Sequence, residues 1–424
     1  MQNYDIAIIG GGAAGLFSAA FASDMGANVV VLEKMERCGR KIGITGKGRC
    51  NLTNTKPWNE FSQHIHTKSN FLKTAFYITD NFAVMKYFES IGLQLVVERG
   101  DRVFPKSMCA HDVSDFLIRH IKDNGAAIIT SFNVSSIKSI DNMFVISSCN
   151  NIDNIYAKKV IIATGGLSYP STGSTGDGYL FAKEFGHHVI SCFPSLTALI
   201  PDKYNLFFDS ISSFFREEKS LLLKNVEVSL IINGNNVATE FGDLDFTSGG
   251  IEGPIGFKVS RKAVFALING QKVELLLDLK PAVSLQQLHS RIMRDLPQCS
   301  NNIEVLLRKL MPLPLVKQFK NYLLSICKGI STDNNDMVAS SIASALKSWK
   351  FKIVSNVGYE RAVVTAGGVS LSDISQKTME SKIISGLYFA GEVLDIDGDT
   401  GGYNLQVAFS TGALAAISAV KSLT

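Results

Sequence analysis

The first 33 residues contain the pattern that most restricts the fold of this chain. An apolar run at residues 6–9 leads directly into Gly10, Gly12 and Gly15, in the spacing G-x-G-x-x-G. A helical stretch follows, and a second apolar run ends at Glu33. Strand, glycine turn, helix and strand in this order predict the start of a parallel sheet of Rossmann type. A glycine-rich turn in another kind of α/β protein is the alternative.

The glycines and the acid each have a role if this unit binds a dinucleotide. Gly10 permits the tight turn, Gly12 lets the backbone approach a pyrophosphate, and Gly15 allows the helix to pack closely against the strand. The helix N-terminus offers free N–H groups and a partial positive charge to the phosphates. Glu33 is placed to accept hydrogen bonds from ribose hydroxyls. Because a carboxylate repels a 2′-phosphate, the pattern disfavours NADP at this site.

The segment after Glu33 favours FAD over NAD. In an NAD dehydrogenase a further βα unit usually follows promptly, whereas residues 34–54 here read KMERCGRKIGITGKGRCNLTN, a basic loop rich in glycine. We expect the glycines to let the backbone fold around a phosphate, while Arg40 and Lys41 balance its charge together with Lys47 and Arg49.

Cys50 in the same loop allows two interpretations. It is either a redox-active thiol, activated by the neighbouring cations, or a packing residue beside the cofactor. No second cysteine lies at the spacing of a disulfide oxidoreductase, which favours packing.

Length and charge limit the remaining classes. A chain of 424 residues suggests two or three domains. Its 42 basic and 38 acidic residues are too evenly balanced to predict nucleic-acid binding, and we find no basic run. The N-terminus lacks the basic segment of a signal peptide, and no apolar run reaches the ~18 residues of a membrane span. We therefore expect a cytoplasmic protein with no membrane partner, and the oligomeric state stays open.

Cysteine and histidine usage predicts neither disulfides nor a metal site. The seven cysteines are scattered, odd in number and without a CxxC pair, as in a reduced cytoplasmic protein. His64 and His66 are close in sequence, but no acidic or cysteine cluster accompanies them, so we expect them in a surface loop.

The loop also resembles a known family. GRKIGITGKGRCNLTN (39–54) is similar to the signature loop of the bacterial BaiN/YhiN-like flavoproteins, which are NAD(P)/FAD-dependent oxidoreductases and include aminoacetone oxidase-like proteins. Four further blocks are similar and occur in family order, namely DRVFPKSMCAHDV (101–113), VIIATGGLSYPSTGSTGDGYLFAKEFGH (160–187), FTSGGIEGP (246–254) and GLYFAGEVLDIDGDTGGYNLQVAFSTG (386–412). The chain departs from the family pattern at Asp101, where glycine is usual, at Ser248, where histidine is usual, and at Glu252, where serine is usual.

The resemblance implies how the chain would hold FAD. A backbone pair near Val134 would bind the adenine edge, Glu392 would bind the ribityl chain, and the first N–H groups of a C-terminal helix near residues 404–406 would face the N1/O2 edge of the flavin. The predicted cofactor contacts are Gly10, Gly12, Ala13, Ala14, Gly15, Glu33, Lys34, Arg40, Lys41, Gly46, Arg49, Cys50, Asn51, Val134, Ala163, Thr164, Gly165, Gly391, Glu392, Asn404, Leu405 and Gln406.

The expected architecture is a discontinuous Rossmann-like FAD-binding domain of α/β class, residues 1–194 and 350–424. It encloses a β-rich, barrel-like subdomain, residues 195–282, and a helical subdomain, residues 283–349. Asn233-Gly234 and Asn269-Gly270 each predict a β-hairpin. Ser284 and Gln287 predict a capping box at the start of a helix.

The expected reaction is hydride transfer between flavin N5 and a small organic substrate or NAD(P)H. Only one dinucleotide fingerprint is visible, so either NAD(P)H docks transiently as electron donor, or a substrate reduces FAD and oxygen reoxidises it. Tyr169 and Tyr403 are candidate proton donors, although packing roles are favoured for both; the catalytic residue is otherwise open. The relatives implied by the resemblance oxidise an amino ketone or reduce steroid enones, so the substrate and the effect of Ser248 stay open. A regulatory, RNA-interacting or RNA-modifying flavoprotein is the alternative function.

Overall fold

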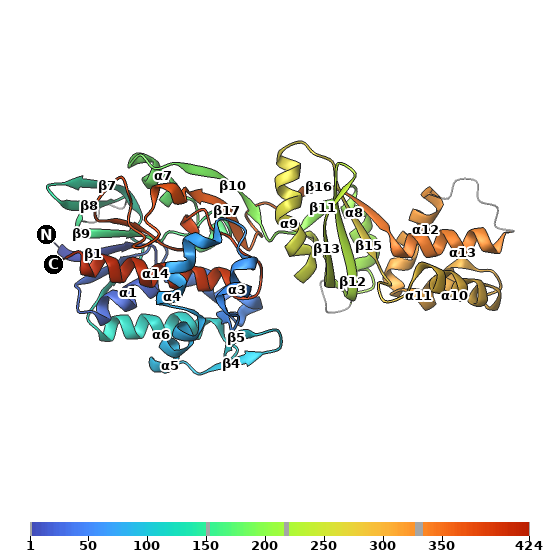
Figure 1. Ribbon diagram of the computed structural model, residues 1–424, viewed down its shortest axis with the longest axis horizontal. Helices are drawn as coiled ribbons and strands as arrows, with labels where there is room; N and C mark the ends of the chain where they lie inside the picture. The colour runs from blue at the N-terminus through green and yellow to red at the C-terminus, as the bar shows by residue number, and fades with distance from the viewer. Residues whose placement is uncertain (1, 150–152, 216–219, 327–333, 424) are drawn as a thin grey trace. The chain divides into compact units, whose positions relative to one another are not determined.

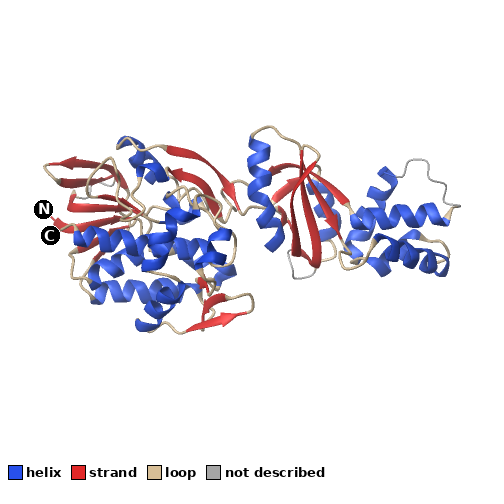
Figure 2. Cartoon of the chain, viewed as in Figure 1, coloured by secondary structure: helices blue, strands red, loops and turns tan. Residues whose placement is uncertain are grey.

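The computed structural model describes residues 2–149, 153–215, 220–326 and 334–423. The chain divides into two compact units, Met1–Ser195 with Tyr359–Thr424, and Leu196–Gly358. Each unit has its own sheet system (Figures 1 and 2).

The first unit is built on a sheet in the order β6-β2-β1-β9-β8-β7, with β18 paired to β9. β1 runs parallel to β2 and β9, and β18 runs parallel to β9, whereas β7, β8 and β9 are antiparallel. The strands are β1 (Gln2–Ile9), β2 (Val29–Leu32), β6 (Ala127–Ile129), β7 (Val134–Ile140), β8 (Met143–Ser148), β9 (Ile155–Ile162) and β18 (Leu387–Phe389).

Both ends of the chain contribute to this sheet and to one helical layer. Helix α1 (Ala13–Asp24) packs against the last helix, α14 (Tyr403–Lys421), as Figure 1 shows. The Ser18 hydroxyl donates a hydrogen bond to the Gly412 carbonyl at 2.9 Å. A Cβ at Gly412 would lie 2.7 Å from the Ala14 carbonyl oxygen, so only glycine permits this close approach. Helix α14 is buried along most of its length.

Smaller elements complete the first unit. A three-stranded sheet, β3-β5-β4, consists of β3 (Thr53–Asn54), β4 (Leu95–Glu98) and β5 (Arg102–Pro105), and β10 (Val189–Ser195) pairs with β17 (Val364–Val369). The remaining helices are α2 (Arg40–Ile44), α3 (Trp58–Phe61), α4 (Lys73–Ile78), α5 (Asn81–Ser90), α6 (Ala110–Asp123) and α7 (Asp177–Glu184), with short 3-10 turns η1 (Thr45–Gly48), η2 (Ser62–His64), η3 (Ser69–Leu72), η4 (Pro170–Thr172), η5 (Leu371–Asp373) and η6 (Gly391–Val393).

The second unit is a closed barrel followed by a helical segment. The barrel order is β11-β14-β13-β12-β15-β16, from β11 (Leu199–Pro201), β12 (Ser220–Ile232), β13 (Asn235–Thr247), β14 (Gly250–Glu252), β15 (Val273–Asp278) and β16 (Trp349–Asn356). Helix α9 (Gly253–Ile268) packs on the barrel strands through an apolar face that includes Val259 and Ala263. The other helices are α8 (Tyr204–Ser212), α10 (Leu285–Gln298), α11 (Ile303–Leu310), α12 (Leu313–Ile326) and α13 (Asn335–Lys347).

The Rossmann-type α/β fold with a barrel and a helical segment is confirmed, and so are two local predictions. Asn233 and Gly234 connect β12 to β13 as a hairpin. Ser284 and Gln287 form the complete capping box of α10, with both reciprocal hydrogen bonds present.

Two sequence expectations differ from the structure. Asn269-Gly270 does not form a hairpin; it ends α9, where Gly270 at φ +70° follows the last helical turn. The boundary expected at residue 350 falls inside β16, because Phe351 and Ile353 are barrel residues paired with β15; the chain returns to the first unit at Tyr359. Among the helices within the described ranges, none is long and apolar enough to cross a bilayer.

Candidate functional site

The glycine turn after β1 is closed on its inner side and open at the start of α1. Gly10 has φ +103°, and a Cβ there would lie 2.6 Å from the Ala163 carbonyl oxygen. A Cβ at Gly15 would collide with the Gly10 carbonyl oxygen. Gly12 caps α1 without any side-chain hydrogen bond, and a Cβ at Gly12 would meet no protein atom within 4 Å. The first turn of α1, with the N–H groups of Ala13 and Ala14, therefore begins beside open space at Gly12.

Glu33 lies directly over this turn. Its side chain accepts hydrogen bonds from the Gly11 N–H at 2.7 Å and from the Met35 N–H at 2.8 Å, and only 8% of the residue is exposed. Burial raises the pKa of Glu33, and the two N–H donors oppose that rise. A carboxylate held at the end of β2 beside the helix start has the placement that ribose recognition requires.

Three cations of this region, Lys34, Arg40 and Lys41, each have an acidic partner, whereas no ion pair joins Lys47 to a described residue. Lys41 Nζ lies 2.7 Å from Glu392 Oε2, and Lys34 Nζ lies 2.6 Å from Asp177 Oδ2. Arg40 pairs with Glu36 at 3.0 Å. The positive charge expected in this loop is thus largely balanced by carboxylates of the same unit.

Arg49 faces a different direction from these three. Its guanidinium lies over the Phe104 ring at 4.7 Å and pairs with Glu98 at 3.5 Å, both on the small β3-β5-β4 sheet. Among the described residues, no hydrogen bond or ion pair joins Arg49 to the Gly10–Gly15 turn.

The C-terminal block reaches the same region through Gly391 and Glu392. A Cβ at Gly391 would lie 2.7 Å from the Ala14 Cβ, and the Gly391 N–H donates to Thr411 Oγ1 at 2.9 Å. Glu392 Oε1 accepts a hydrogen bond from the Thr365 N–H at 2.8 Å. Segments that are far apart in sequence thus meet beside the start of α1.

The second glycine-rich block, after β9, joins this cluster. Thr365 Oγ1 accepts hydrogen bonds from the N–H groups of Leu167 at 2.8 Å and Ser168 at 3.1 Å. Ala163 is buried, and Gly165 adopts φ +73°. Thr164 Oγ1 is buried and forms no hydrogen bond with any described residue, so it has capacity for a bound group.

Val134 begins β7, and Phe132, two residues before it, donates its N–H to the Glu33 carbonyl at 2.9 Å. The start of β7, with Val134, therefore lies near Glu33, the residue expected to bind the ribose.

Helix α14 starts without a side-chain cap, as α1 does. Gly402 is its N-cap at φ +88°. The Asn404 side chain turns back to the preceding loop, accepting from the Gly398 N–H at 2.9 Å and donating to the Gly398 carbonyl at 2.8 Å. Gln406 is fully buried and bonds to Thr53 Oγ1 at 2.6 Å. The side chains of Asn404 and Gln406 are therefore structural, and the backbone N–H groups from Tyr403 to Leu405 are what this helix offers a ligand.

Asn51 and Cys50 tie the signature loop to α14. With its amide oriented to satisfy both neighbours, Asn51 donates to the Thr53 carbonyl at 3.0 Å and accepts from the Gly402 N–H at 3.1 Å. Cys50 is completely buried, and burial raises its pKa to about 12 against a weaker opposing hydrogen bond from Thr45. The thiol is therefore not activated, contrary to one of the two interpretations of Cys50. Gly46 takes φ +57° in the turn before it.

This arrangement fits FAD on observations within one unit. The N-termini of α1 and α14 have no side-chain cap, the space at Gly12 is open, and the Glu33 carboxylate is buried beside the start of α1. Thr164 Oγ1 is a buried oxygen with no hydrogen-bond partner among the described residues. The individual contacts remain predictions.

The two tyrosine candidates differ in their surroundings. Tyr403 is 4% exposed, and burial together with the negative charges of Asp399, Glu60 and Asp101 raises its pKa. Tyr169 is half-buried at φ +54°, and its N–H donates to the Tyr359 carbonyl at 2.9 Å.

Sequence reasoning missed a cluster beside Tyr403. His64 and His66 both pair with Asp399, which is 335 positions from His64 in the chain. Only the fold brings these residues together, and a sequence pattern gives no signal for a pair at such separation. Among the described residues, no group of three or more His, Cys, Asp or Glu side chains has the arrangement of a metal site.

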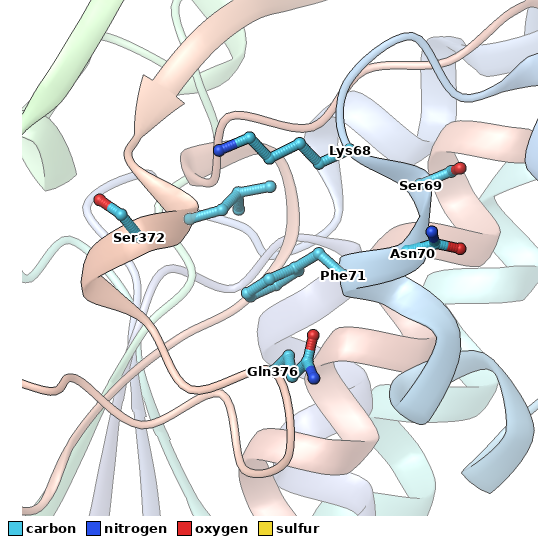
Figure 3. Close-up of a pocket in the computed structure, with 7 residues that line it drawn as sticks. Lys68, Ser69, Asn70, Phe71, Ser372 and Gln376 are labelled. Atoms are coloured by element: carbon cyan, nitrogen blue, oxygen red, sulfur yellow. The ribbon is translucent and has the colours of Figure 1, made fainter.

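A separate pocket of about 450 Å³ opens on the first unit (Figure 3). It lies between η3 and η5 and is lined by Lys68, Ser69, Asn70, Phe71, Leu371, Ser372 and Gln376. None of these residues belongs to the predicted cofactor contacts.

Comparison with known proteins identifies the family. Residues 4–418 match the family described as HI0933-like protein Rossmann domain. The chain belongs to this family. A "3-dehydro-bile acid delta(4,6)-reductase" of Clostridium scindens is 29% identical over 426 residues, 98% of this chain and 99% of that protein. A "Ribosomal RNA dihydrouridine synthase" of Haemophilus influenzae is 32% identical over 432 residues, 97% of each chain.

Solved structures share the fold. The 3-ketosteroid delta1-dehydrogenase of Sterolibacterium denitrificans superposes with a TM-score of 0.54 at 12% identity, over the full length of both chains. The 3-ketosteroid-delta4-(5alpha)-dehydrogenase of Rhodococcus jostii gives a TM-score of 0.50 at 13% identity, over 99% of this chain and 97% of that one.

Proposed function

We propose that this chain, a flavin-dependent oxidoreductase, uses FAD to reduce a carbon–carbon double bond conjugated to a carbonyl group. The proposal rests on one observation: Gly12, Glu33 and Glu392 lie around the start of α1, which has no side-chain cap. The family match, over residues 4–418, includes all three residues. Bound flavin would supply hydride chemistry. The protein would supply binding, orientation and a proton.

The two relatives share a chemical step despite their different substrates. A delta(4,6) double-bond system next to a 3-oxo group, as in a 3-dehydro bile acid, is a conjugated dienone. Uridine carries a double bond conjugated to its C4 carbonyl, and its saturation gives dihydrouridine. In both substrates, saturation of the α,β double bond would add hydride at the β carbon and a proton at the α carbon. We infer that this chain performs the same step on a small molecule.

For the cofactor, the N–H groups of Ala13 and Ala14 would bind the pyrophosphate, Glu33 the ribose, and Glu392 the ribityl chain. The N-terminus of α14 would stabilise negative charge at the flavin N1/O2 edge. NAD(P)H is the proposed electron donor, docking transiently. The cysteines within the described ranges are scattered and form no disulfide, which supports a cytoplasmic setting.

The test is anaerobic mixing of purified FAD-loaded protein with NADH, NADPH or neither, followed by 2-cyclohexenone. Bleaching of the oxidised flavin by one nicotinamide and its recovery on addition of the enone are expected. Absence of recovery with cyclic enones, together with rapid recovery with oxygen alone, would contradict a double-bond reductase and favour an oxidase.

A second candidate substrate is RNA, and one observation favours it. Residues 280–352 contain 11 Lys and Arg against 4 Asp and Glu, whereas the rest of the chain has 31 against 34, from totals of 42 and 38. This basic segment includes α10 to α13 of the second unit. Lys309 and Lys317 on it are exposed and form no ion pair with any described residue. The nearly equal totals of basic and acidic residues in the whole chain do not reveal this local excess of positive charge. Such an excess favours binding to a phosphate backbone.

Unmodified ribosomal RNA transcripts incubated with the reduced enzyme would test this candidate. Gain of two mass units on a uridine, with binding that weakens steeply as salt rises, would support it. A product from enones but none from RNA would assign the small-molecule reaction instead.

A further inference from the structure

Asp399, His64 and His66 form a side-chain cluster that the proposed function has not used. Asp399 lies in the loop between η6 and α14, and its two carboxylate oxygens face two rings. His64 Nδ1 lies 2.8 Å from Asp399 Oδ2, and His66 Nε2 lies 3.0 Å from Asp399 Oδ1. We call these three residues the His–Asp–His cluster.

Backbone hydrogen bonds also hold the His–Asp–His cluster together. The Asp399 N–H donates to the His64 carbonyl at 2.9 Å, and the His66 N–H donates to the Asp397 carbonyl at 2.9 Å. Ile65 and Gly398 pair between them as an antiparallel bridge. The two histidines are therefore held in register with the loop that leads into α14.

The cluster stands beside the helix start expected to face the flavin. The His64 ring stacks on the ring of Tyr403, the first residue of α14, with centroids 4.5 Å apart and planes inclined at 27°. Asn404 Nδ2 donates to the Asp399 carbonyl at 3.1 Å. The chain then continues from His66 into Lys68–Phe71, which line the open pocket of Figure 3.

The charges around the cluster suit a histidine that donates a proton. Burial alone would raise the pKa of Asp399, but the hydrogen bonds and charges of His66 and His64 hold it below its ordinary value, so the carboxylate is an anion. Tyr403 from α14 and the buried Asp397 also face this region, and Glu60 from α3 and Asp101 act on Tyr403. An aspartate bound at Nδ1 orients an imidazole and leaves Nε2 as the nitrogen that can exchange a proton with a substrate.

We propose that His64, oriented by Asp399, is the catalytic acid of the double-bond reduction. This inference rests on the proposed function. Bound reduced flavin would supply hydride to the β carbon of the conjugated double bond, and the π electrons would move to the carbonyl oxygen as an enolate. His64 Nε2–H then gives its proton to the α carbon, which yields the saturated carbonyl compound and a neutral imidazole. The imidazole would recover its proton from solvent, and NAD(P)H, the proposed electron donor, would supply the hydride for the next turnover.

The stereochemistry of protonation tests this role, because a merely structural histidine would not control it. The probe is 2-methylcyclohex-2-enone, whose α carbon becomes a stereocentre when it is protonated. FAD-loaded wild type, His64→Gln and His66→Gln are reduced with dithionite and mixed with the probe without oxygen. FAD content and the extent of flavin reduction are measured first for each variant, which separates loss of fold from loss of chemistry.

We expect wild type to form one enantiomer of 2-methylcyclohexanone. His64→Gln should react ~100-fold or more slowly, the low end for loss of a general acid, and give racemic product because solvent protonates the enolate. His66→Gln, which keeps the His64–Asp399 pair, should stay within about tenfold of wild type and keep the enantiomer.

Retention of rate and enantiomeric excess by His64→Gln would overturn the assignment while the reductase function stands. Racemic product from wild type would do the same. Failure of wild type to reoxidise with the probe would instead refute the proposed function.

Discussion

Replacement of Gly12 by valine separates cofactor binding from folding. Gly12 has φ −84° and ψ −166°, an extended backbone that valine adopts, and a Cβ there meets no protein atom within 4 Å. The apoprotein should therefore lose less than about 1 kcal/mol of stability, mainly through a weaker N-cap. The branched side chain would occupy the space through which α1 reaches a pyrophosphate.

The expected loss of FAD affinity follows from the contacts removed. Two hydrogen bonds from α1 N–H groups to charged phosphate oxygens, at about 1.5 kcal/mol each, amount to about 3 kcal/mol. Since each 1.4 kcal/mol is a factor of ten, the Kd for FAD should rise ~100-fold. Titration of apoprotein with FAD, followed by quenching of flavin fluorescence, measures it.

Two further glycine variants are matched controls for Gly12→Val. Gly15→Ala should lose both stability and FAD, because its Cβ would collide with the Gly10 carbonyl oxygen. Gly256→Ala in α9 should lose neither, because its Cβ would make an ordinary 3.4 Å contact with Leu244. A Gly12→Val protein that binds FAD within threefold of wild type would refute the placement of the pyrophosphate at α1.

Three other outcomes follow from the structure. Asp399→Asn should destabilise the protein by about 2 kcal/mol at pH 7, since hydrogen bonds to a charged group are lost. Because the folded pKa of Asp399 lies below its ordinary value of 3.8, the difference in stability between wild type and variant should shrink as pH falls through that folded pKa. Urea titrations that show the same difference in stability at all pH values would contradict this. Iodoacetamide should label the exposed Cys149 long before Cys50, whose buried thiol has a pKa raised to about 12, and peptide mapping that finds Cys50 labelled first in folded protein would show that its burial is wrong. Gly234→Ala should cost about 1 kcal/mol, because Gly234 at φ +86° closes the β12–β13 hairpin, while FAD content stays unchanged; a thermal midpoint equal to that of wild type would argue against this turn.

Structural features that depend on a few adjacent residues were predictable from the sequence. The glycine turn and its flanking strands, the Asn233-Gly234 hairpin and the capping box of α10 each depend on a few consecutive side chains whose conformational preferences agree with the fold. Asn269-Gly270 shows the limit of this reasoning. The same dipeptide ends a helix there, because the sixteen residues before it bury one helical face against the barrel, and that packing outweighs the local turn preference.

Features that depend on the path of the chain were not predictable. The pairing of Lys41 with Glu392 spans 351 positions, so the sequence showed a basic loop where the structure has balanced charges. His64 and His66 read as isolated surface residues because their carboxylate partner enters from the other end of the chain. The domain boundary was misplaced for a related reason: β16 completes a barrel whose other strands begin some 150 residues earlier, at Leu199.

We expect residues from both ends of the chain to bind the same FAD molecule. Amide hydrogen exchange of the apoprotein with and without FAD tests it most directly. FAD should slow exchange in two peptides together, one covering the start of α1 near Ala13 and the other covering the start of α14 near Asn404. Slower exchange in only one of these peptides, or in neither, at saturating FAD would contradict the account.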